Sequence, residues 1–487
     1  MSLVPPTEAI PMAQLGRVHF TGVGGAGMSG IARIMLSRGV AVSGSDSAAS
    51  DLLTALAELG ADVHVGHSAG HVAGADTLVV SSAIRPDNPE LVAAKRRGLR
   101  VIHRAAALAS VMLGRRGIAV AGTHGKTTTT SMLTTALRHA GADPGYVIGG
   151  ILTETGLGAD DGSGPFLVAE ADESDGSFLM LSPELAIVTG VEADHLDNYA
   201  GLAEIEAAFA KFTRRIRPGG VLIACADNPG ARSLAAAARD LPVRVRTYGE
   251  AKDADYRVTG LRTGGMSVSF EAAAGPRAVA GCPPVAKLTV SVPGRHNSLN
   301  AIAAYSAALE LGLDAGLIAA GLASYAGARR RMEPKGEGNG VLVLDSYAHH
   351  PTELAADLRA AREIRPGGRV VAVFQPHLYS RTRIFADQFG AVLGLADEAI
   401  VLDVYAARED PEPGVTGRLV ADAVPGGRGR FVPDRGSVPA AAAAAARPGG
   451  LVLTMGAGDV TALGPLIVDA LRAQSVDHLA AAPPGGW

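Results

Sequence analysis

Short apolar runs alternate with helical patterns along most of the chain. In the N-terminal part the runs predict strands, and the segments between them carry apolar residues at the spacing of a helix that covers a sheet. The expected strands are 17–22, 40–43, 63–65, 77–81 and 100–103, and the expected helices are 28–38, 51–59 and 89–97. Strands that alternate with helices favour a parallel sheet whose ligand lies at the carboxyl ends of the strands.

The same alternation returns in the central and C-terminal parts. The central strands are expected at 118–121, 166–169, 185–189 and 221–224, with helices at 128–139, 202–216 and 298–311. The C-terminal strands are expected at 341–344, 369–374, 399–403 and 451–454, with helices at 352–363 and 440–446. Between 244 and 292 the period changes to alternation, which predicts a β-rich flap or a small antiparallel sheet.

A chain of 487 residues is too long for a single hydrophobic core, and about three domains are expected. The predicted fold class is α/β. The expected domains are a Rossmann-like domain at 1–114, a central P-loop ATPase-type domain with a small β-rich part at 115–326, and a second Rossmann-like domain at 327–487. Residues 108–116 are expected to bridge the first two domains.

Charge and cysteine content exclude several classes of partner. A formal net charge of −4 gives no field that would hold a nucleic-acid backbone. Cys225 and Cys282 are too few for a disulfide framework, and nothing pairs them at metal-ligand spacing. No apolar run has the length of a membrane span, and the N-terminus lacks the pattern of a signal peptide. We therefore expect a cytoplasmic protein, monomeric or weakly dimeric, that acts on small molecules.

The strongest chemical signal is a phosphate-binding loop between an apolar strand and a helix. It reads Gly122, Thr123, His124, Gly125, Lys126, Thr127, Thr128. In such a loop the lysine reaches the outer phosphates and the first threonine hydroxyl binds Mg²⁺. The common version has a glycine six residues before the lysine, where this chain has Val120, so the loop is a shortened form. The pattern predicts a nucleotide triphosphate site.

Two further strands of the central part end on groups that bind metals. Glu170 ends the strand 166–169 and opens an acidic turn, Glu170–Asp175, and His195 follows the strand 185–189. At the carboxyl edge of a parallel sheet both would face the phosphate loop. A carboxylate, a threonine hydroxyl and an imidazole could then share one or two Mg²⁺ ions at the γ-phosphate. Lys126, Glu170 and His195 are therefore the candidate catalytic residues.

The N-terminal domain carries a second glycine loop. The segment Gly22–Gly27 follows the first strand, and Asp46 follows the second. Taken literally, GxGxxG with an acidic residue about 20 positions later is the fingerprint of a dinucleotide site. An NAD-dependent oxidoreductase is therefore one function to consider, although it leaves Lys126 and the acidic turn unexplained.

Three smaller groups of polar residues complete the candidates. His296, Asn297 and Asn300 lie at a helix start, where amide and imidazole side chains suit an adenine ring. Arg331 closes an arginine run, Arg329–Arg331, that could clamp a triphosphate. His377 and Arg381 flank a strand end, where an arginine can bind a small carboxylate through two hydrogen bonds.

A series of motifs spans essentially the whole chain. In order they are GVGGAGMSG, SGSD, SSAI, GTHGKTTT, EADESD, EADHLD, PGRHNSLNA, RRME, DSYAHHPTE, QPHLYSRT and GAGDVT. Together they closely resemble the Mur ligases of peptidoglycan synthesis. The resemblance implies that ATP and Mg²⁺ are used to join L-alanine to UDP-N-acetylmuramate through an acyl phosphate. Within the same family, a recycling ligase that attaches a tripeptide to this UDP-sugar is the alternative.

The resemblance also assigns residues to ligands. The first glycine loop would hold the diphosphate of the UDP-sugar instead of NAD, because a helix N-terminus binds either pyrophosphate. The UDP-sugar contacts would be Gly24, Gly25, Ala26, Gly27, Asp46, His67, Ser81 and Ser82. Lys126 would hold the β- and γ-phosphates, and the Mg²⁺ ligands would be Thr127, Glu170 and His195. Asn297, Asn300 and Arg331 would contact ATP, and His349, His377 and Arg381 would position alanine.

Two positions depart from the family pattern. Members often have Asn where Gly190 stands and a second Asp where Ser346 stands. The aligned Asp helps to seat the nucleotide, and Asp345 is expected to take over this contact. A non-catalytic nucleotide-binding regulator is a further alternative, motivated by these two departures.

Overall fold

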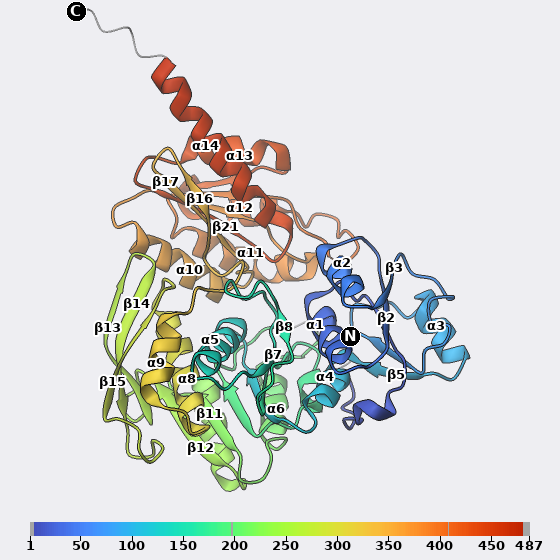
Figure 1. Cartoon of the computed structure of the whole chain (residues 1–487). Coiled ribbons are helices and arrows are strands. Elements are labelled where there is room, and N and C mark those ends of the chain that lie inside the picture. The colour runs from blue at the N-terminus through green and yellow to red at the C-terminus, as the bar shows by residue number, and fades with distance from the viewer. Residues whose placement is uncertain (1–3, 196–197, 408, 481–487) are drawn as a thin grey trace, which may run out of the picture. The chain divides into compact units, whose positions relative to one another are not determined.

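The computed structural model describes residues 4–195, 198–407 and 409–480, with side chains described as far as residue 474. Three sheets form its framework, each covered by helices (Figure 1). The chain divides into two compact units. The first comprises Met1–Leu261, Phe270–Val290 and Ser298–Ala326, and the second comprises Arg262–Ser269, Ser291–Asn297 and Gly327–Trp487. Each unit is described by itself below.

The N-terminal sheet has five parallel strands in the order β3-β2-β1-β4-β5. Its strands are β1 (Val18–Thr21), β2 (Val42–Asp46), β3 (Asp62–Val65), β4 (Thr77–Val80) and β5 (Arg100–His103). Its helices are α1 (Ala26–Ser37), α2 (Asp51–Glu58), α3 (Pro89–Arg96) and α4 (Arg104–Met112). Every residue of β1 is buried, as expected for a central strand covered on both faces. The predicted elements of this domain are confirmed. The expected bridge 108–116 comprises the last part of α4, a short turn and the first residue of β6 (Arg116–Ala121).

The central sheet has ten strands in the order β15-β14-β13-β12-β11-β10-β6-β9-β7-β8. The strands before residue 226 are β6 (Arg116–Ala121), β7 (Gly145–Val147), β8 (Ala159–Asp160), β9 (Phe166–Glu170), β10 (Leu185–Val188) and β11 (Val221–Cys225). The others are β12 (Arg244–Gly249), β13 (Tyr256–Gly264), β14 (Ser267–Ala274) and β15 (Val285–Val290). The stretch 244–292 is rich in strands, as predicted. The expectation of a separate small sheet is wrong, because β12 pairs in parallel with β11 and the later strands extend the same sheet.

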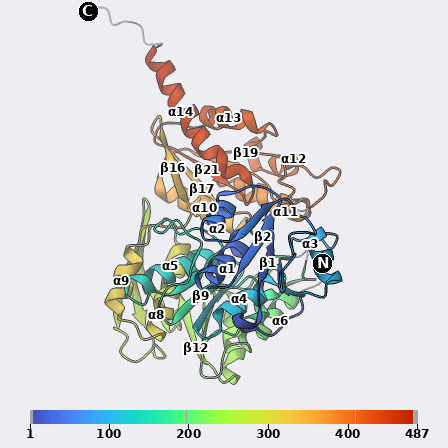
Figure 2. The ribbon, with the colours of Figure 1, turned by 45° about the vertical axis from the view of Figure 1, so that its right-hand side comes forward.

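Helices α5 and α9 pack closely against each other beside this sheet (Figures 1 and 2). The helices of the central part are α5 (Lys126–His139), α6 (Leu202–Thr213), α7 (Pro229–Ala237), α8 (His296–Glu310) and α9 (Ala315–Ala323). Helix α5 is buried although it is rich in threonine, and hydroxyls such as that of Thr134 donate to the carbonyl four residues back. A Cβ on Gly321 of α9 would lie 2.8 Å from Ala136 Cα. Glycine at this position therefore lets the two helices approach.

The C-terminal sheet has six strands in the order β16-β17-β21-β18-β19-β20. Its strands are β16 (Glu333–Gly338), β17 (Val341–Ser346), β18 (Val370–Phe374), β19 (Glu398–Val401), β20 (Gly429–Phe431) and β21 (Leu451–Met455). Its helices are α10 (Pro351–Ile364), α11 (Tyr379–Leu393), α12 (Gly417–Asp422), α13 (Val438–Ala445) and α14 (Leu463–Ala480). All pairs are parallel except β16 with β17, so the predicted doubly wound arrangement is confirmed.

The sequence patterns did not predict helices α7, α9, α11 and α14 or the antiparallel strand β16. Among the described residues, no helix has the length and apolar character needed to cross a membrane. The exact limits of the three domains stay a prediction.

The close approach of α5 and α9 gives a test of the packing. We expect Gly321→Val to lower the free energy of unfolding by about 1–3 kcal/mol, because the added side chain meets the backbone of α5. Urea denaturation measures this loss. The matched control is Ala320→Val, which also ends in a valine side chain but adds only two methyl groups, at an exposed position of the same helix. Equal stability of the two variants would contradict the packing described here.

Candidate active site

The phosphate loop has the backbone geometry that its glycines predict. Gly122 follows β6 with φ 125°, and Gly125 precedes α5 with φ 81°. Both angles lie in the left-handed region, where glycine is favoured. A Cβ on Gly122 would also come within 2.2 Å of Thr189 Oγ1. The loop therefore requires glycine at these two positions and leaves the N-terminus of α5 without a side-chain cap.

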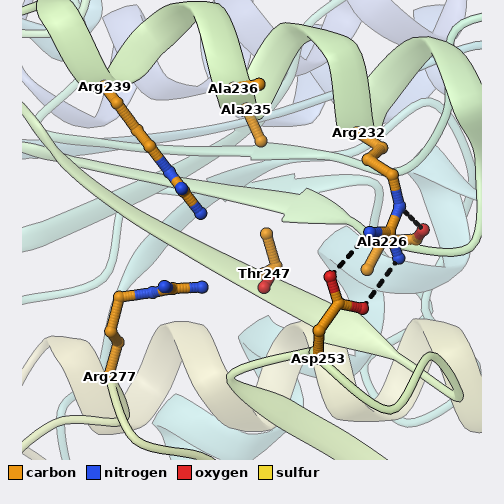
Figure 3. Close-up of a pocket in the computed structure, with 8 residues that line it drawn as sticks. All are labelled: Ala226, Arg232, Ala235, Ala236, Arg239, Thr247, Asp253 and Arg277. Atoms are coloured by element: carbon orange, nitrogen blue, oxygen red, sulfur yellow. Dashed lines mark hydrogen bonds and ion pairs between the residues drawn. The ribbon is translucent and has the colours of Figure 1, made fainter.

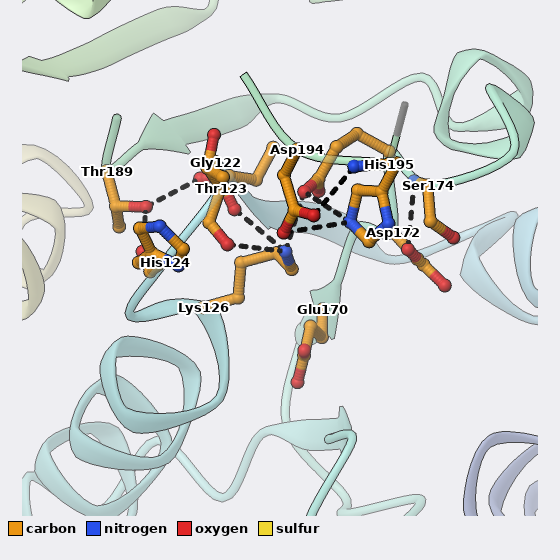
Figure 4. A network of polar contacts seen from close by, with 12 residues as sticks. Gly122, Thr123, His124, Lys126, Glu170, Asp172, Ser174, Thr189, Asp194 and His195 are labelled. Atoms are coloured by element: carbon orange, nitrogen blue, oxygen red, sulfur yellow. Dashed lines mark hydrogen bonds and ion pairs between the residues drawn. The ribbon is translucent and has the colours of Figure 1, made fainter. Parts of the chain in front are cut away.

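Lys126 lies at the centre of a polar network (Figure 4). Its Nζ donates to the Gly122 carbonyl at 2.8 Å and to Glu173 Oε1 at 2.9 Å. Burial disfavours the charged amine, but the carboxylates of Glu173, Asp172 and Glu170 outweigh this effect and raise the pKa of Lys126. The phosphate loop therefore carries a permanent positive charge where the outer phosphates are expected.

Two of the three predicted Mg²⁺ ligands lie together. The Thr127 hydroxyl is 3.1 and 3.0 Å from the two carboxylate oxygens of Glu170, and the Gly149 N–H donates to the same carboxylate at 2.8 Å. A hydroxyl and a carboxylate are the oxygen donors that Mg²⁺ prefers. Among the described residues, no set of three or more His, Cys, Asp or Glu side chains is suited to hold a metal.

The third predicted ligand, His195, reaches the network through other carboxylates. Its Nε2 lies 3.7 Å from Glu173 Oε1 and 3.7 Å from Asp194 Oδ2. Burial opposes its charge, but these two carboxylates raise the pKa of His195 above its ordinary value. The backbone at His195 has φ 53°, an uncommon conformation for a residue with a side chain. Residues 196 and 197, which complete the motif EADHLD, lie outside the described part of the chain.

Every carboxylate of the acidic turn has a partner. Glu170 contacts Thr127 and Glu173 contacts Lys126, as described above. Asp172 accepts from Arg104 Nη2 at 2.5 Å, and Asp175 accepts from Ser82 and lies 3.5 Å from His103 Nε2. His103 and Arg104 belong to the N-terminal domain, where α4 begins. Neither residue is predicted from the sequence, because no local pattern distinguishes them from ordinary surface residues.

The first glycine loop opens onto the N-terminus of α1, which has no side-chain cap. The Gly24 N–H donates to Asp46 Oδ2 at 2.8 Å, so the predicted acidic residue braces the loop. A Cβ on Gly24 would lie 2.9 Å from the same oxygen. The loop is thus held tight by Asp46 and exposes a helix N-terminus suited to a phosphate.

A buried carboxylate supports His67, another predicted UDP-sugar contact. The His67 Nδ1 is 2.9 Å from Ser45 Oγ, and Ser45 Oγ donates to Glu90 Oε2 at 2.7 Å. Glu90 is fully buried, and Thr21 and His71 also hydrogen-bond to it, at 2.8 and 2.9 Å. Burial opposes its charge, but a hydrogen bond with His19, together with those from Ser45, His71 and Thr21, holds the pKa of Glu90 well below its usual range. Glu90 is not predicted from the sequence. Ser81, a predicted contact, lies half-buried at the end of β4.

The two predicted amides lie at the start of α8. Asn300 is buried against the phosphate loop: Thr129 Oγ1 donates to its Oδ1 at 3.2 Å, and a Cβ on Gly125 would come within 2.6 Å of that oxygen. Asn297 Nδ2 donates to the Pro293 carbonyl at 2.7 Å. Asn300 thus belongs to the phosphate-loop site, while Asn297 holds the segment before the helix.

One predicted nucleotide contact of the second unit, His296, lies beside a buried acid, Asp357. His296 Nε2 lies 4.0 Å from Asp357 Oδ1, and the Ser346 hydroxyl donates to Asp357 Oδ2. Desolvation lowers the pKa of His296, and burial raises the pKa of Asp357 to about 7. Arg331 lies over the ring of Tyr347 at 5.3 Å.

Asp345 is fully buried inside the C-terminal domain. Its carboxylate accepts from Thr454 Oγ1 at 2.6 Å and Thr461 Oγ1 at 2.7 Å, and it lies 3.5 Å from Arg330 Nε. These contacts engage both oxygens. A direct contact between Asp345 and the nucleotide stays a prediction.

The expected amino-acid residues gather at the ends of β17 and β18. The rings of His349 and His377 have centroids 6.3 Å apart, and His377 stacks on Tyr405 at 5.8 Å. Arg381 lies half-buried in the first turn of α11, four residues after His377. Tyr405 is an aromatic neighbour that the sequence analysis did not select.

The two departures from the family pattern have local explanations. A Cβ on Gly190 would lie 3.2 Å from Asn228 Nδ2, so Asn228 already brings an amide to that place. Asn228 Oδ1 accepts from the Val191 N–H at 3.0 Å and its Nδ2 donates to Glu192 at 3.1 Å. Ser346 is hydrogen-bonded to Asp357, so a carboxyl group stands beside that position as well.

A cavity of about 200 Å³ lies elsewhere in the central domain (Figure 3). None of the predicted site residues lines it. Its walls include Arg232, Arg239 and Arg277. Arg232 is bound to Asp253 at 2.7 Å and Arg277 lies 3.0 Å from Asp255, so two of these cations are used in pairs within the protein.

Family models match nearly the whole chain. Residues 17–116 match "Mur ligase family, catalytic domain", residues 120–308 match "Mur ligase middle domain", and residues 330–458 match "Mur ligase, glutamate ligase domain". The chain belongs to the Mur ligase family. As a Mur ligase it is an ATP-dependent ligase enzyme. The match over the first glycine loop does not support the NAD-dependent oxidoreductase considered from its sequence.

Similar proteins agree with this assignment over nearly their full length. A UDP-N-acetylmuramate–L-alanine ligase of Thermobifida fusca is 57% identical, with 97% of this chain and 100% of the relative covered. A ligase of the same name from Kineococcus radiotolerans is 58% identical, with 94% and 97% covered. Among solved structures, the UDP-N-acetylmuramate-alanine ligase of Thermotoga maritima matches with a TM-score of 0.79 at 28% identity, covering 94% of this chain and 99% of that one. The predicted three-domain α/β fold of a Mur ligase is thereby confirmed.

The buried acid of the second unit gives a pH-dependent test. A carboxyl with a pKa of about 7 in the folded protein and 3.8 in the unfolded chain binds its proton more tightly when folded. Its contribution to stability therefore falls as pH rises from about 4 to 7 and stays constant above that. We expect Asp357→Asn to stabilise the protein at pH 8, by a few kcal/mol at most, and by much less at pH 4.

Thermal unfolding of the variant and the parent at both pH values measures this difference. Asp387→Asn is the control, because this carboxylate is exposed on the neighbouring helix α11. A gain from Asp357→Asn that is equal at pH 8 and pH 4 would contradict the raised pKa.

Proposed function

We propose that the chain joins L-alanine to the lactyl carboxylate of UDP-N-acetylmuramate at the expense of ATP, the first step of stem-peptide addition in peptidoglycan synthesis. The observation that carries the chemistry is the phosphate loop, where Lys126 and Thr127 face the carboxylates of Glu173 and Glu170. The names of relatives at 57% and 58% identity over nearly the full length supply the substrates.

The reaction has two steps. In the first, a carboxylate oxygen of UDP-N-acetylmuramate attacks the γ-phosphorus of ATP, a new P–O bond forms, and ADP leaves. The product is an acyl phosphate. In the second step the neutral amine of L-alanine attacks the acyl carbon, a tetrahedral intermediate forms, and inorganic phosphate leaves as the amide bond is made. The amine loses one proton in this step.

The charge of Lys126 suits the first step. During phosphoryl transfer negative charge is spread over the γ-phosphate oxygens, and a fixed cation stabilises it without reorganisation. Lys126 is kept charged by Glu173 and the neighbouring carboxylates, so it needs no proton from the substrate. On ATP binding its ammonium would exchange the carbonyl of Gly122 for phosphate oxygens, while Glu173 keeps it in place.

The oxygen donors of the site fit Mg²⁺, and we assign Thr127 and Glu170, with His195, to hold it. Bound there, the ion would neutralise charge on the phosphates of ATP. The hydroxyl and carboxylate already face one another at about hydrogen-bond distance. His195 lies beside Glu173, one contact away from Lys126.

The remaining predicted residues are assigned to the other ligands. We assign the diphosphate of the UDP-sugar to the N-terminus of α1, with His67, Ser81 and Ser82 around the rest of that ligand. We assign the alanine carboxylate to Arg381, beside His349 and His377. Asn297, Asn300 and Arg331 would contact ATP. The reaction is placed in the cytoplasm, and the protein is proposed to act as a monomer or weak homodimer.

A tripeptide in place of alanine is the second candidate. A murein peptide ligase of Psychrobacter arcticus shares the fold with a TM-score of 0.70 at 25% identity, over 94% of this chain and 99% of that one. This protein is less similar to the chain than the relatives named as alanine ligases are, which favours alanine as the substrate. The two functions differ only in the amine, so one assay separates them.

Phosphate release with ATP, Mg²⁺ and UDP-N-acetylmuramate, measured with and without L-alanine, tests the proposal. We expect release that requires both substrates and falls roughly 1,000-fold or more in Lys126→Met, because the transferring phosphoryl group loses its fixed cation. Lys211→Met is the matched control, since this lysine is exposed on α6. Far-UV circular dichroism checks that Lys126→Met stays folded although Glu173 loses its lysine partner.

Three other results would change the assignment. Release with the tripeptide and none with alanine would make the chain a recycling ligase. No release with either amine, together with tight ATP binding, would indicate a non-catalytic regulator. Full activity of Lys126→Met would mean that the phosphate loop does not perform the chemistry assigned to it.

A further inference from the structure

Arg104 connects the first glycine loop to the acidic turn. It is the first residue of α4, and its Nη2 donates to Asp172 Oδ2 at 2.5 Å. Its Nη1 lies 3.3 Å from the place that a Cβ on Gly27 would occupy. Gly27 belongs to the first turn of α1, where the helix N-terminus has no side-chain cap. One guanidinium therefore reaches both the proposed UDP-sugar site and the edge of the phosphate-loop site.

The guanidinium of Arg104 has hydrogen-bond donors that its contact with Asp172 does not use. A guanidinium has five N–H donors, and within the described residues the hydrogen bond to Asp172 is the one that Arg104 makes. The side chain is 26% exposed, so the free donors are partly shielded from water but still accessible. Burial opposes the charge, but Asp172 and Asp175 outweigh it and raise the pKa of Arg104. A charged group with unused donors beside an open helix N-terminus is suited to a phosphate.

We propose that Arg104 binds the diphosphate of the UDP-sugar and that Asp172 competes with the ligand for this arginine. The inference rests on the proposed function, because it adds a binding residue to the same site. Without ligand, the ion pair with Asp172 holds the guanidinium between the two domains. With ligand, its N–H groups donate to phosphate oxygens that also accept from the N–H groups at the start of α1. No covalent bond changes in this exchange.

The position of Nη1 favours the diphosphate over the lactyl carboxylate as the partner. Nη1 lies at Gly27, within the loop that holds the diphosphate in the proposed site. The lactyl carboxylate must instead reach the γ-phosphate beside Lys126. Lys126 is bound by Glu173, the neighbour of Asp172 along the turn, so the two cations have separate partners.

Ligand binding without ATP tests the proposal, and two substitutions should act in opposite directions. In isothermal titration calorimetry with UDP-N-acetylmuramate, we expect Arg104→Met to raise the Kd roughly 10- to 100-fold, the loss of a charge-assisted hydrogen bond to a phosphate. We expect Asp172→Asn to lower the Kd several-fold, because the competing carboxylate is removed. In the double variant that combines Arg104→Met with Asp172→Asn, the gain in affinity from Asp172→Asn should be smaller.

UDP alone is the second probe, because it has the diphosphate and lacks the sugar and its carboxylate. We expect Arg104→Met to raise the Kd for UDP and the Kd for UDP-N-acetylmuramate by similar factors. A loss confined to UDP-N-acetylmuramate would overturn the assignment to the diphosphate.

A second ion pair between the same two domains is the matched control. Arg38 Nε at the end of α1 donates to Asp161 at 2.9 and 2.8 Å, and both side chains are more shielded from water than Arg104 and Asp172. We expect Arg38→Met and Asp161→Asn to leave the Kd for UDP unchanged. An unchanged Kd for ATP in Arg104→Met would show that this variant is folded.

Weaker binding in both Arg104→Met and Asp172→Asn would overturn the proposal, since it would make the pair a structural bridge. The proposal would also be overturned if Asp161→Asn raised the Kd for UDP as much as Arg104→Met does. If Arg104→Met binds UDP as tightly as the parent protein, and the parent uses alanine as a substrate, this inference is overturned and the proposed function stays intact. A parent that binds no UDP-sugar would overturn both.

Discussion

One buried ammonium balances the charge of the region where the phosphate loop meets the acidic turn. Lys126 lies among the carboxylates of Glu173, Asp172 and Glu170, and Glu173 is itself only 2% exposed. A buried carboxylate without a partner would be strongly unfavourable, and so would a buried amine. The ammonium of Lys126 and the carboxylate of Glu173 therefore stabilise each other's charge. The loop conformation follows from the same requirement, since the Gly122 carbonyl also accepts from this ammonium.

The features that could be predicted are those that have a local cause in the sequence. A glycine turn between an apolar strand and a helix predicts its own geometry, and both Gly122 and Gly125 have the positive φ that the loop requires. Parallel strands bring their carboxyl ends to one edge, which places Glu170 beside Thr127 although 43 residues separate them. The strand and helix periods likewise predicted most elements, because alternating burial leaves a clear pattern.

The features that were missed depend on contacts between distant segments. Arg104 and Glu90 have ordinary neighbours in sequence and acquire their roles only when the fold brings Asp172 and Ser45 to them. The strands after residue 244 have an alternating pattern that fits a separate sheet equally well. The pairing of β12 with β11, two strands from different parts of the sequence pattern, is what makes them extend the central sheet. The departures at Gly190 and Ser346 belong to the same class, since Asn228 and Asp357 come from other elements.

The ends of the ten-stranded sheet have a consequence for self-association. An exposed edge strand offers unpaired N–H and C=O groups to another chain, and proteins limit this by keeping the edge short or charged. One edge here is β8, which has only two residues, Ala159–Asp160. The other is β15, which is longer but carries the exposed Lys287 at its centre. The edge at β8 thus offers too little backbone to pair with a strand of another chain. At the edge formed by β15, a second copy would have to remove water from the charge of Lys287.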